Sequence, residues 1–196
     1  MGQIDIKIVE NSQSRYYRDF IKIPFAIYQG QPNWVPWFDK DMIAFIDRLH
    51  PLFEHSTGDF FVAMKGSRPV GRIFVFENTR YNKTHSLNSA CFYFIDFIDD
   101  GEVAAKLFQA AIDWAKNRSL DGLMGPMGLG GVTGVGVLAA GFEHRAAMKP
   151  ADHAQRNPGM QIPALHGQRQ HKAAYEQKYR GIHIHGSDFI AGCNTQ

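Results

Sequence analysis

Alternating and recurring apolar positions divide the first part of the chain into short strands and helices. Residues 3–9 place Ile4, Ile6 and Ile8 between polar and charged residues, which predicts a strand with one buried face. Further short apolar runs predict strands at residues 59–65, 70–77, 90–97 and 120–124. Glycine and proline separate the first two of these runs, so we expect them to form a hairpin.

Two early stretches have apolar residues at helical spacing. The first begins at Asn11 or Ser12 and is expected to end at about residue 23, because Pro24 lacks the N–H that the next turn needs. The second begins at Asp39 or Asp41 and is expected to run through residue 49. Its predicted buried face consists of Met42, Phe45, Ile46 and Leu49.

The most informative pattern is a strand, a turn, a long helix and a second strand over residues 90–126. The helix, at residues 103–116, has one apolar stripe formed by Val103, Leu107, Ala111 and Trp114. A strand, a crossover helix and a second strand predict a parallel pair with a right-handed connection. Residues 78–88 are polar and are expected to form an exposed loop. A hairpin followed by this unit predicts a mixed α/β sheet.

Composition narrows the class of protein. The chain has 196 residues, of which 44% are hydrophobic, enough to form the core of one domain. Its net charge of +2 is too small to attract nucleic acid by a strong positive electrostatic field. No apolar run is long enough to span a membrane, and the N-terminus has no secretion signal. Cys91 and Cys193 show no paired spacing. We therefore expect a reduced, cytoplasmic protein that binds neither membrane nor nucleic acid.

The character of the chain changes near residue 148. Residues 149–196 contain few large apolar residues, no clear period and five of the nine histidines. We expect a domain over residues 1–148 and a tail of uncertain order over residues 149–196, which would be a truncated or altered end of the domain. The pattern does not predict the oligomeric state.

Several short segments resemble those of a known superfamily. They are Pro24-Phe25 with Tyr28, Pro32-Asn33-Trp34-Val35-Pro36, Val70-Gly71-Arg72-Ile73, Tyr81-Asn82, residues 94–100 and Gly125-Pro126. With the order of elements, they are similar to the GNAT superfamily of N-acyltransferases, in particular to a bacterial group of unassigned activity whose members continue into a second part. The resemblance covers residues 4–148. It implies an α/β fold with a mixed, mainly antiparallel sheet and flanking helices.

The resemblance also implies a reaction and a set of sites. An acyl-CoA, acetyl-CoA or another, would lie against the strand at residues 90–97 and give its acyl group to a small-molecule or peptide amine. The implied cofactor-binding residues are Phe94, Ile95, Phe97, Asp99, Gly101 and Val103. Trp34 and Trp37 would line the acceptor pocket. Position alone gives the candidate bases Asp96 and Glu77 and the candidate acids Tyr175 and Tyr179.

The turn that would hold the CoA pyrophosphate departs from the pattern of the superfamily. It reads Ile98-Asp99-Asp100-Gly101-Glu102-Val103, without the usual basic residue, and its carboxylates would repel a pyrophosphate. Asp99 and Glu102 instead fit a capping box, in which both side chains bind the N–H groups of the helix itself. A catalytically inactive GNAT-like binding domain is therefore the alternative hypothesis.

Two further patterns resemble ligand-binding motifs. Residues 134–139 satisfy a glycine-rich dinucleotide-binding pattern, but no strong strand runs into Gly134, so a nucleotide binder is the third hypothesis. His183 and His185 would share a strand face, but no cysteine or carboxylate lies near them at zinc-binding spacing. We expect no metal site.

Overall fold

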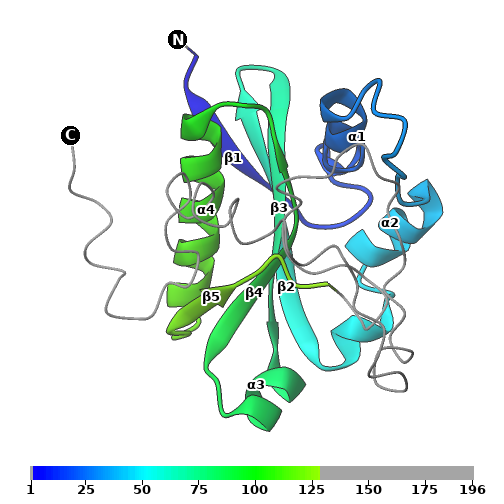
Figure 1. The fold of residues 1–196 in the computed structure, drawn as a ribbon. Helices are drawn as coiled ribbons and strands as arrows, with labels where there is room; N and C mark the ends of the chain where they lie inside the picture. The colour runs from blue at the N-terminus through cyan, green and yellow to red at the C-terminus, as the bar shows by residue number, and fades with distance from the viewer. Residues whose placement is uncertain (1, 129–196) are drawn as a thin grey trace, which may run out of the picture.

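In the computed structural model, which describes residues 2–128, a mixed sheet separates two layers of helices (Figure 1). Its five strands, in spatial as well as chain order, are β1 (Ile4–Val9), β2 (Ser56–Lys65), β3 (Arg68–Asn78), β4 (Ser89–Phe97) and β5 (Gly122–Met124). Strands β1 to β4 pair antiparallel, and β4 and β5 pair parallel. The predicted hairpin, the parallel pair and the mainly antiparallel α/β architecture are confirmed.

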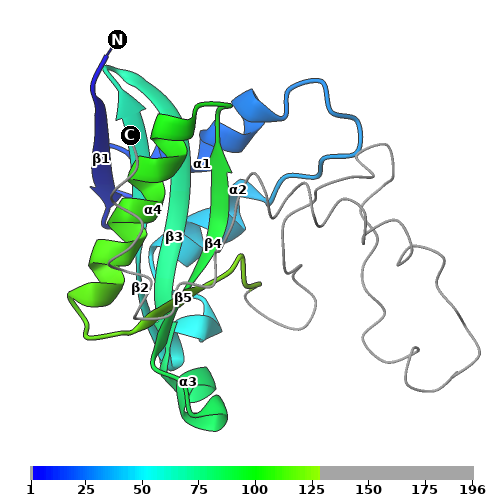
Figure 2. The same ribbon diagram turned by 60° about the vertical axis from the view of Figure 1, so that its left-hand side comes forward.

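Helices cover both faces of this sheet. The helices among residues 2–128 are α1 (Tyr17–Ile27), α2 (Asp39–Ile46), the 3-10 helix η1 (Pro51–Glu54), α3 (Thr79–His85), which lies at the end of β3 and β4, and α4 (Gly101–Lys116). Helix α4 lies along one face, and α1 and α2 lie on the other (Figure 2). None of the helices among residues 2–128 has the length and apolar character that crossing a membrane requires.

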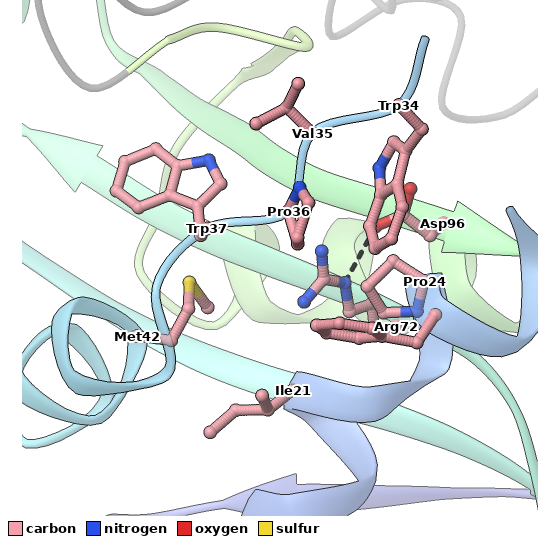
Figure 3. A pocket seen from close by; sticks show the side chains of 10 residues that line it. Ile21, Pro24, Trp34, Val35, Pro36, Trp37, Met42, Arg72 and Asp96 are labelled. Atoms are coloured by element: carbon pink, nitrogen blue, oxygen red, sulfur yellow. Dashed lines mark hydrogen bonds and ion pairs between the residues drawn. The ribbon is translucent and has the colours of Figure 1, made fainter. Parts of the chain in front are cut away.

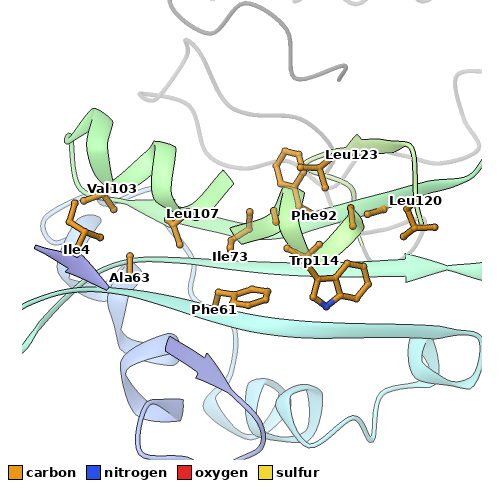
Figure 4. Close-up of a cluster of buried hydrophobic side chains, with 14 of the residues drawn as sticks. Ile4, Phe61, Ala63, Ile73, Phe92, Val103, Leu107, Trp114, Leu120 and Leu123 are labelled. Carbon is orange, nitrogen blue, oxygen red and sulfur yellow. The ribbon is translucent and has the colours of Figure 1, made fainter. Parts of the chain in front are cut away.

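The core has two halves, one on each face of the sheet. On the α4 face, the predicted stripe of the helix is buried against the central strands (Figure 4). On the other face, phenylalanine rings from α1, α2 and the strands pack edge to face, with Phe45 in ring contact with Phe60, Phe74 and Phe94. This aromatic packing fixes α1 and α2 against the strand that carries the candidate site.

Gly71 allows α4 to lie close to β3. A Cβ atom at this position would lie 2.9 Å from Cδ1 of Leu107, 2.9 Å from Cβ of Phe97 and 3.0 Å from Cγ1 of Val103. We expect Gly71→Ala to lower the free energy of unfolding by about 1–3 kcal/mol, as overpacking does. Denaturant titration would measure this loss. Gly101→Ala is the control, because a Cβ atom there meets nothing within 4 Å.

The prediction that Pro24 ends the first helix is wrong. Helix α1 begins at Tyr17, not at Asn11 or Ser12, and continues past Pro24 to Ile27. Proline removes the N–H that would bind the carbonyl oxygen four residues earlier, which is that of Phe20. This oxygen accepts instead from Nη1 of Arg72 at 2.8 Å. A side chain from β3 thus satisfies the group that the proline leaves without a partner.

Three other local predictions are corrected. Helix α2 ends at Ile46 because Arg48 adopts a left-handed conformation (φ 61°), which leaves Leu49 75% exposed. Residues 78–88 are not simply an exposed loop, because the Asn78 side chain caps α3 by accepting from the backbone N–H of Tyr81. In β1, Ile8 is 53% exposed, so the alternation does not extend along the whole strand.

Candidate functional site

An irregularity in β4 shapes the centre of the candidate site. The register with β3 is regular up to Tyr93, which lies opposite Phe74, and then shifts so that Asp96 lies opposite Arg72. Phe94, within the irregular stretch, has a positive φ of 48°. A bulge of this kind bends the strand and redirects its side chains. Here it places Phe94 among the rings of the α1 and α2 face, edge to face with Trp37.

Strand β5 leaves β4 close to this bulge. The two strands pair only from Ser89 to Cys91, and the last contact is a hydrogen bond of 2.9 Å from the N–H of Met127 to the oxygen of Phe92. Among residues 2–128, the outer edge of β4 beyond Phe92 has no strand partner. Unpaired backbone groups on such an edge can bind an extended ligand.

The turn after β4 starts α4 with a capped N-terminus. Asp100, not Asp99, is the capping residue, because its Oδ1 accepts from the N–H of Glu102 at 3.0 Å. The expected capping box between Asp99 and Glu102 is therefore corrected. Oδ2 of Asp100 forms an ion pair of 3.0 Å with Nζ of Lys65. The end of β2 thus brings a positive charge to a turn that carries none of its own.

The cap of α4 is expected to make the stability of the protein depend on pH. The hydrogen bond from Lys65, followed by that from the N–H of Glu102, lowers the pKa of Asp100 below its ordinary value of 3.8. A carboxyl whose pKa is lowered by folding stabilises the protein above its unfolded pKa, and this contribution is lost as pH falls through the folded pKa. We expect Asp100→Ala to lower the melting temperature at pH 7, and the difference from wild type to shrink below about pH 4.

Asp99→Ala is the matched control for this experiment. The Asp99 side chain is exposed and makes no hydrogen bond or ion pair within residues 2–128. An equal loss of melting temperature in both variants would contradict the assignment of the cap.

A pocket lies beside the β4 bulge, on the face covered by α1 and α2 (Figure 3). It contains about 350 Å³ of open space, including its mouth. Its walls are formed by Ile21, Pro24, Phe25, Trp34, Val35, Pro36, Trp37, Met42, Arg72 and Asp96. Apart from the last two residues, these side chains are apolar or aromatic. Apolar walls with few polar groups are typical of pockets that bind small molecules.

Arg72 and Asp96 form a buried ion pair on the floor of the pocket. Nε of Arg72 lies 2.7 Å from Oδ2 of Asp96, and the two side chains are only 7% and 12% exposed. The other carboxylate oxygen, Oδ1, accepts from the hydroxyl of Tyr28 at 2.7 Å. Burial, with the charge of Asp96 as the next cause, raises the pKa of Tyr28, so its hydroxyl keeps its proton. Burial lowers the pKa of Arg72, and Asp96 opposes this effect.

The environment of Arg72 fixes its guanidinium in one orientation. The group lies 5.0 Å from the ring centre of Phe20 and 5.4 Å from that of Phe94, which places it over two aromatic faces. Nε binds Asp96 and Nη1 binds the backbone oxygen of Phe20. Within the described part of the chain, the hydrogen bonds of the guanidinium use Nε and Nη1, and none involves Nη2. The N–H groups of Nη2 are therefore left for another molecule.

The structure brings three of the residues selected from sequence into this pocket. Asp96, Trp34 and Trp37 all line it. Glu77 lies five residues along β3 from Arg72, roughly 17 Å away at the usual rise of a strand, and does not line the pocket. Tyr175 and Tyr179 lie outside the described residues.

The six cofactor-binding candidates lie on β4 and at the start of α4. Phe94, Ile95 and Phe97 lie on β4 beyond the point where β5 leaves it, and Asp99, Gly101 and Val103 lie in the turn and the first helical turn. Ile95 and Phe97 pack toward the α4 core, Phe94 lies on the opposite face, and the Val103 side chain is buried. The backbone N–H of Val103 also interacts with the Asp100 carboxylate, so a ligand at this position would have to compete with Asp100.

Sequence reasoning missed two residues of the site, Tyr28 and Lys65, and did not identify Asp96 as the partner of Arg72. A buried arginine in an apolar strand requires a carboxylate partner, which was the available signal for Asp96. The shift in register that places the two residues opposite each other leaves no mark in the alternation of apolar positions.

Among residues 2–128, no other motif adds a group to the site. Within residues 2–128, no group of three or more histidine, cysteine or carboxylate side chains could hold a metal ion. The pattern at residues 134–139, together with His183 and His185, lies outside the described residues. The Cys91 thiol is buried, and burial raises its pKa to about 12, so it is not a nucleophile at neutral pH.

Comparisons with known proteins find bacterial relatives of this chain. No protein-family model matches the chain. It is 32% identical to protein YghO of Escherichia coli over 124 residues, which cover 63% of this chain and 32% of that protein. It is 30% identical to a bacterial ceramide synthase of Caulobacter vibrioides over 141 residues, which cover 71% of this chain and 37% of that protein. The chain thus spans about a third of the length of these two relatives.

The fold of this chain is similar to that of a solved structure. A tandem GNAT protein from the clavulanic acid biosynthesis pathway, without acetyl-CoA, superposes with a TM-score of 0.50 at 15% identity. The match covers 62% of this chain and 35% of that one. The expected GNAT-like fold is confirmed.

Proposed function

We propose that this chain, which has the fold of the GNAT acetyltransferases, is an N-acyltransferase that moves an acyl group from acyl-CoA to an amine. The observation that carries the proposal is the β4 bulge, where the unpaired edge of the strand and the pocket with Asp96 meet. A donor on the edge and an acceptor in the pocket would come together at this point of the sheet. Binding two reactants in the correct geometry is itself a large part of catalysis.

In this proposal, the thioester end of acyl-CoA lies along β4 at Phe94, Ile95 and Phe97. A backbone N–H of this edge would stabilise the negative charge that develops on the carbonyl oxygen. The pyrophosphate would lie at the turn from Asp99 to Val103, where Lys65 supplies a positive charge that the turn lacks. Because Asp100 already occupies Lys65 and the N–H of Glu102, a pyrophosphate would have to compete with this cap.

The amine of the acceptor would enter the pocket between Trp34 and Trp37. Its nitrogen attacks the thioester carbon, the C–S bond breaks, and an amide and a CoA thiolate are formed. Asp96 is the proposed acceptor of the proton that the nitrogen loses, and a protonated group must return a proton to the thiolate. Tyr175 or Tyr179 is the proposed donor of that proton. Glu77 remains the second candidate base.

The Caulobacter relative supports this class of reaction. Its name describes a ceramide synthase, and a ceramide is a long-chain amino alcohol acylated on its nitrogen. The apolar walls of the pocket in this chain would suit an amine with an apolar body. We therefore propose an amine of this amphiphilic kind as the acceptor.

Release of CoA thiol tests the proposed reaction. The chain is incubated with acetyl-CoA or a long-chain acyl-CoA and with a panel of amines, and the amide is identified by mass spectrometry. We expect thiol and amide in equal amounts. Asp96→Asn should lower kcat by a factor of about 10²–10⁴, as expected for the loss of a general base, whereas Asp5→Asn on β1 should not. Absence of thiol release with every donor and amine would contradict the proposal.

One observation favours a second candidate function. The acidic turn and the Asp100 cap fill the place where a pyrophosphate would lie, which suits a binding domain without catalysis. Such a domain would bind an amine in the pocket and give no thiol release.

A further inference from the structure

We propose that Arg72 and Asp96 determine the specificity of the pocket by selecting ligands that carry a neutral oxygen beside an amine. The inference rests on the proposed function for the identity of the amine as acceptor. It depends on the contacts of Arg72 and Asp96 inside the pocket.

The two side chains present one donor and one acceptor next to each other. Nη2 of Arg72 has no acceptor within residues 2–128, although the side chain is buried and lines the pocket. Each oxygen of Asp96 accepts one hydrogen bond and retains a further lone pair. Figure 3 shows the guanidinium on the floor of the pocket, with Trp34 and Trp37 on either side of the opening.

This pairing matches a ligand with the opposite pattern. An amine or ammonium group would donate to Asp96, and an oxygen on the neighbouring carbon would accept from Nη2 of Arg72. Nη2 is bonded to the same guanidinium carbon as Nε, and Nε lies 2.7 Å from Oδ2 of Asp96, so the free donor lies next to the carboxylate. The oxygen and nitrogen of a vicinal amino alcohol are neighbours in the same way. The remaining walls are apolar and would contact the rest of the ligand.

Charge decides which oxygen fits. Asp96 already neutralises Arg72, so the floor of the pocket carries no net positive charge. A ligand carboxylate would gain little from Arg72 and would be repelled by Asp96. A hydroxyl or an amide oxygen avoids this repulsion and still accepts from Nη2. The preferred ligand is thus an amino alcohol or amino amide rather than an amino acid.

The geometry is rigid enough for such discrimination. Nη1 of Arg72 binds the oxygen of Phe20, which Pro24 leaves without a helical partner. The rings of Phe20 and Phe94 lie against the guanidinium, and the hydroxyl of Tyr28 donates to Asp96. A buried donor that is left without an acceptor is unfavourable, so a ligand lacking the oxygen binds less well. Lysine cannot reproduce this arrangement, because it has no fork of planar donors.

Binding of three matched ligands tests the proposal without need of turnover. Quenching of tryptophan fluorescence reports binding of 2-aminododecan-1-ol, dodecylamine and 2-aminododecanoic acid, each below the concentration at which it forms micelles. We expect the amino alcohol to bind about 10- to 100-fold more tightly than the plain amine, and more tightly than the amino acid. Equal affinity of wild type for the amino alcohol and the amine would overturn the proposal.

Two variants test whether Arg72 causes the preference for the amino alcohol. Arg72→Lys should reduce the preference for the amino alcohol to less than about threefold, whereas Arg68→Lys, the same change at an exposed position of β3, should keep it. Retention of the full preference in a folded Arg72→Lys variant would overturn the assignment. If that variant does not fold, the three ligands on wild type still decide the matter.

The same measurements separate this inference from the proposed function. If the amino alcohol is preferred in binding but no acyl-CoA yields an amide, the specificity stands and the acyltransferase proposal fails. If amides form at equal kcat/KM from the amino alcohol and the plain amine, the acyltransferase proposal stands and the inference fails.

Discussion

Asp96→Ala is expected to lower the free energy of unfolding by about 3–5 kcal/mol, the loss typical of a broken buried ion pair. The change would leave the guanidinium of Arg72 buried without its carboxylate partner and would also deprive the Tyr28 hydroxyl of its acceptor. Chemical denaturation measures the loss, with Asp5→Ala as a control because the ion pair of Asp5 is half exposed.

A double variant shows whether the instability of Asp96→Ala comes from the unpaired charge of Arg72 or from the loss of the Asp96 side chain itself. Replacing both residues, with Arg72→Met and Asp96→Leu, removes both buried charges and should recover much of the stability lost in Asp96→Ala. If the double variant is as unstable as the sum of the two single variants, the two side chains do not act as a coupled pair. In that case the account of the pocket floor would be wrong.

Gly125→Ala is expected to lower the free energy of unfolding by about 3 kcal/mol. The loss is large because the added methyl group would clash with β4 at the point where β5 leaves it. A Cβ atom there would lie 2.5 Å from the backbone oxygen of Phe92 and 2.7 Å from its ring, and the φ of Gly125 is +158°. The oxygen of Phe92 also accepts from the N–H of Met127, so the added methyl group would disturb the last contact between the two chain segments.

Gly30→Ala is the control for this variant. Gly30 also has a positive φ, +82°, but a Cβ atom there would meet nothing within 4 Å. It therefore carries the conformational penalty without the clash, and we expect a loss of only about 1 kcal/mol. Equal losses in both variants, measured by denaturant titration, would show that the close approach of Gly125 to β4 is not important.

The strands and the α4 unit could be predicted because their signals are local. The apolar run at β4, the stripe of α4 and the run at β5 each follow the period of one element, and a crossover helix has only one common handedness. Tertiary contacts overrode local signals elsewhere. Pro24 remains inside α1 because Arg72 binds the carbonyl that the proline leaves free. Leu49 is exposed because Arg48 turns the chain at the end of α2.

The site was predicted only in part for the same reason. The resemblance indicated a pocket wall at Trp34 and Trp37, and position on the strand indicated Asp96. The pairing of Asp96 with Arg72 depends on a bulge that shifts the register, and the approach of Lys65 to Asp100 depends on how β2 ends beside α4. Neither distance can be read from the spacing of residues along the chain.

The central claim, that acyl-CoA binds between β4 and the start of α4, is tested most directly by titration calorimetry of the 196-residue chain. Asp99→Asn removes one negative charge from the turn but leaves the Asp100 cap intact. We expect acetyl-CoA to bind wild type and to bind this variant about threefold more tightly, whereas acetyl-pantetheine, which lacks the pyrophosphate, should bind both forms equally. No heat with acetyl-CoA at millimolar concentration, in wild type and variant alike, would contradict the claim.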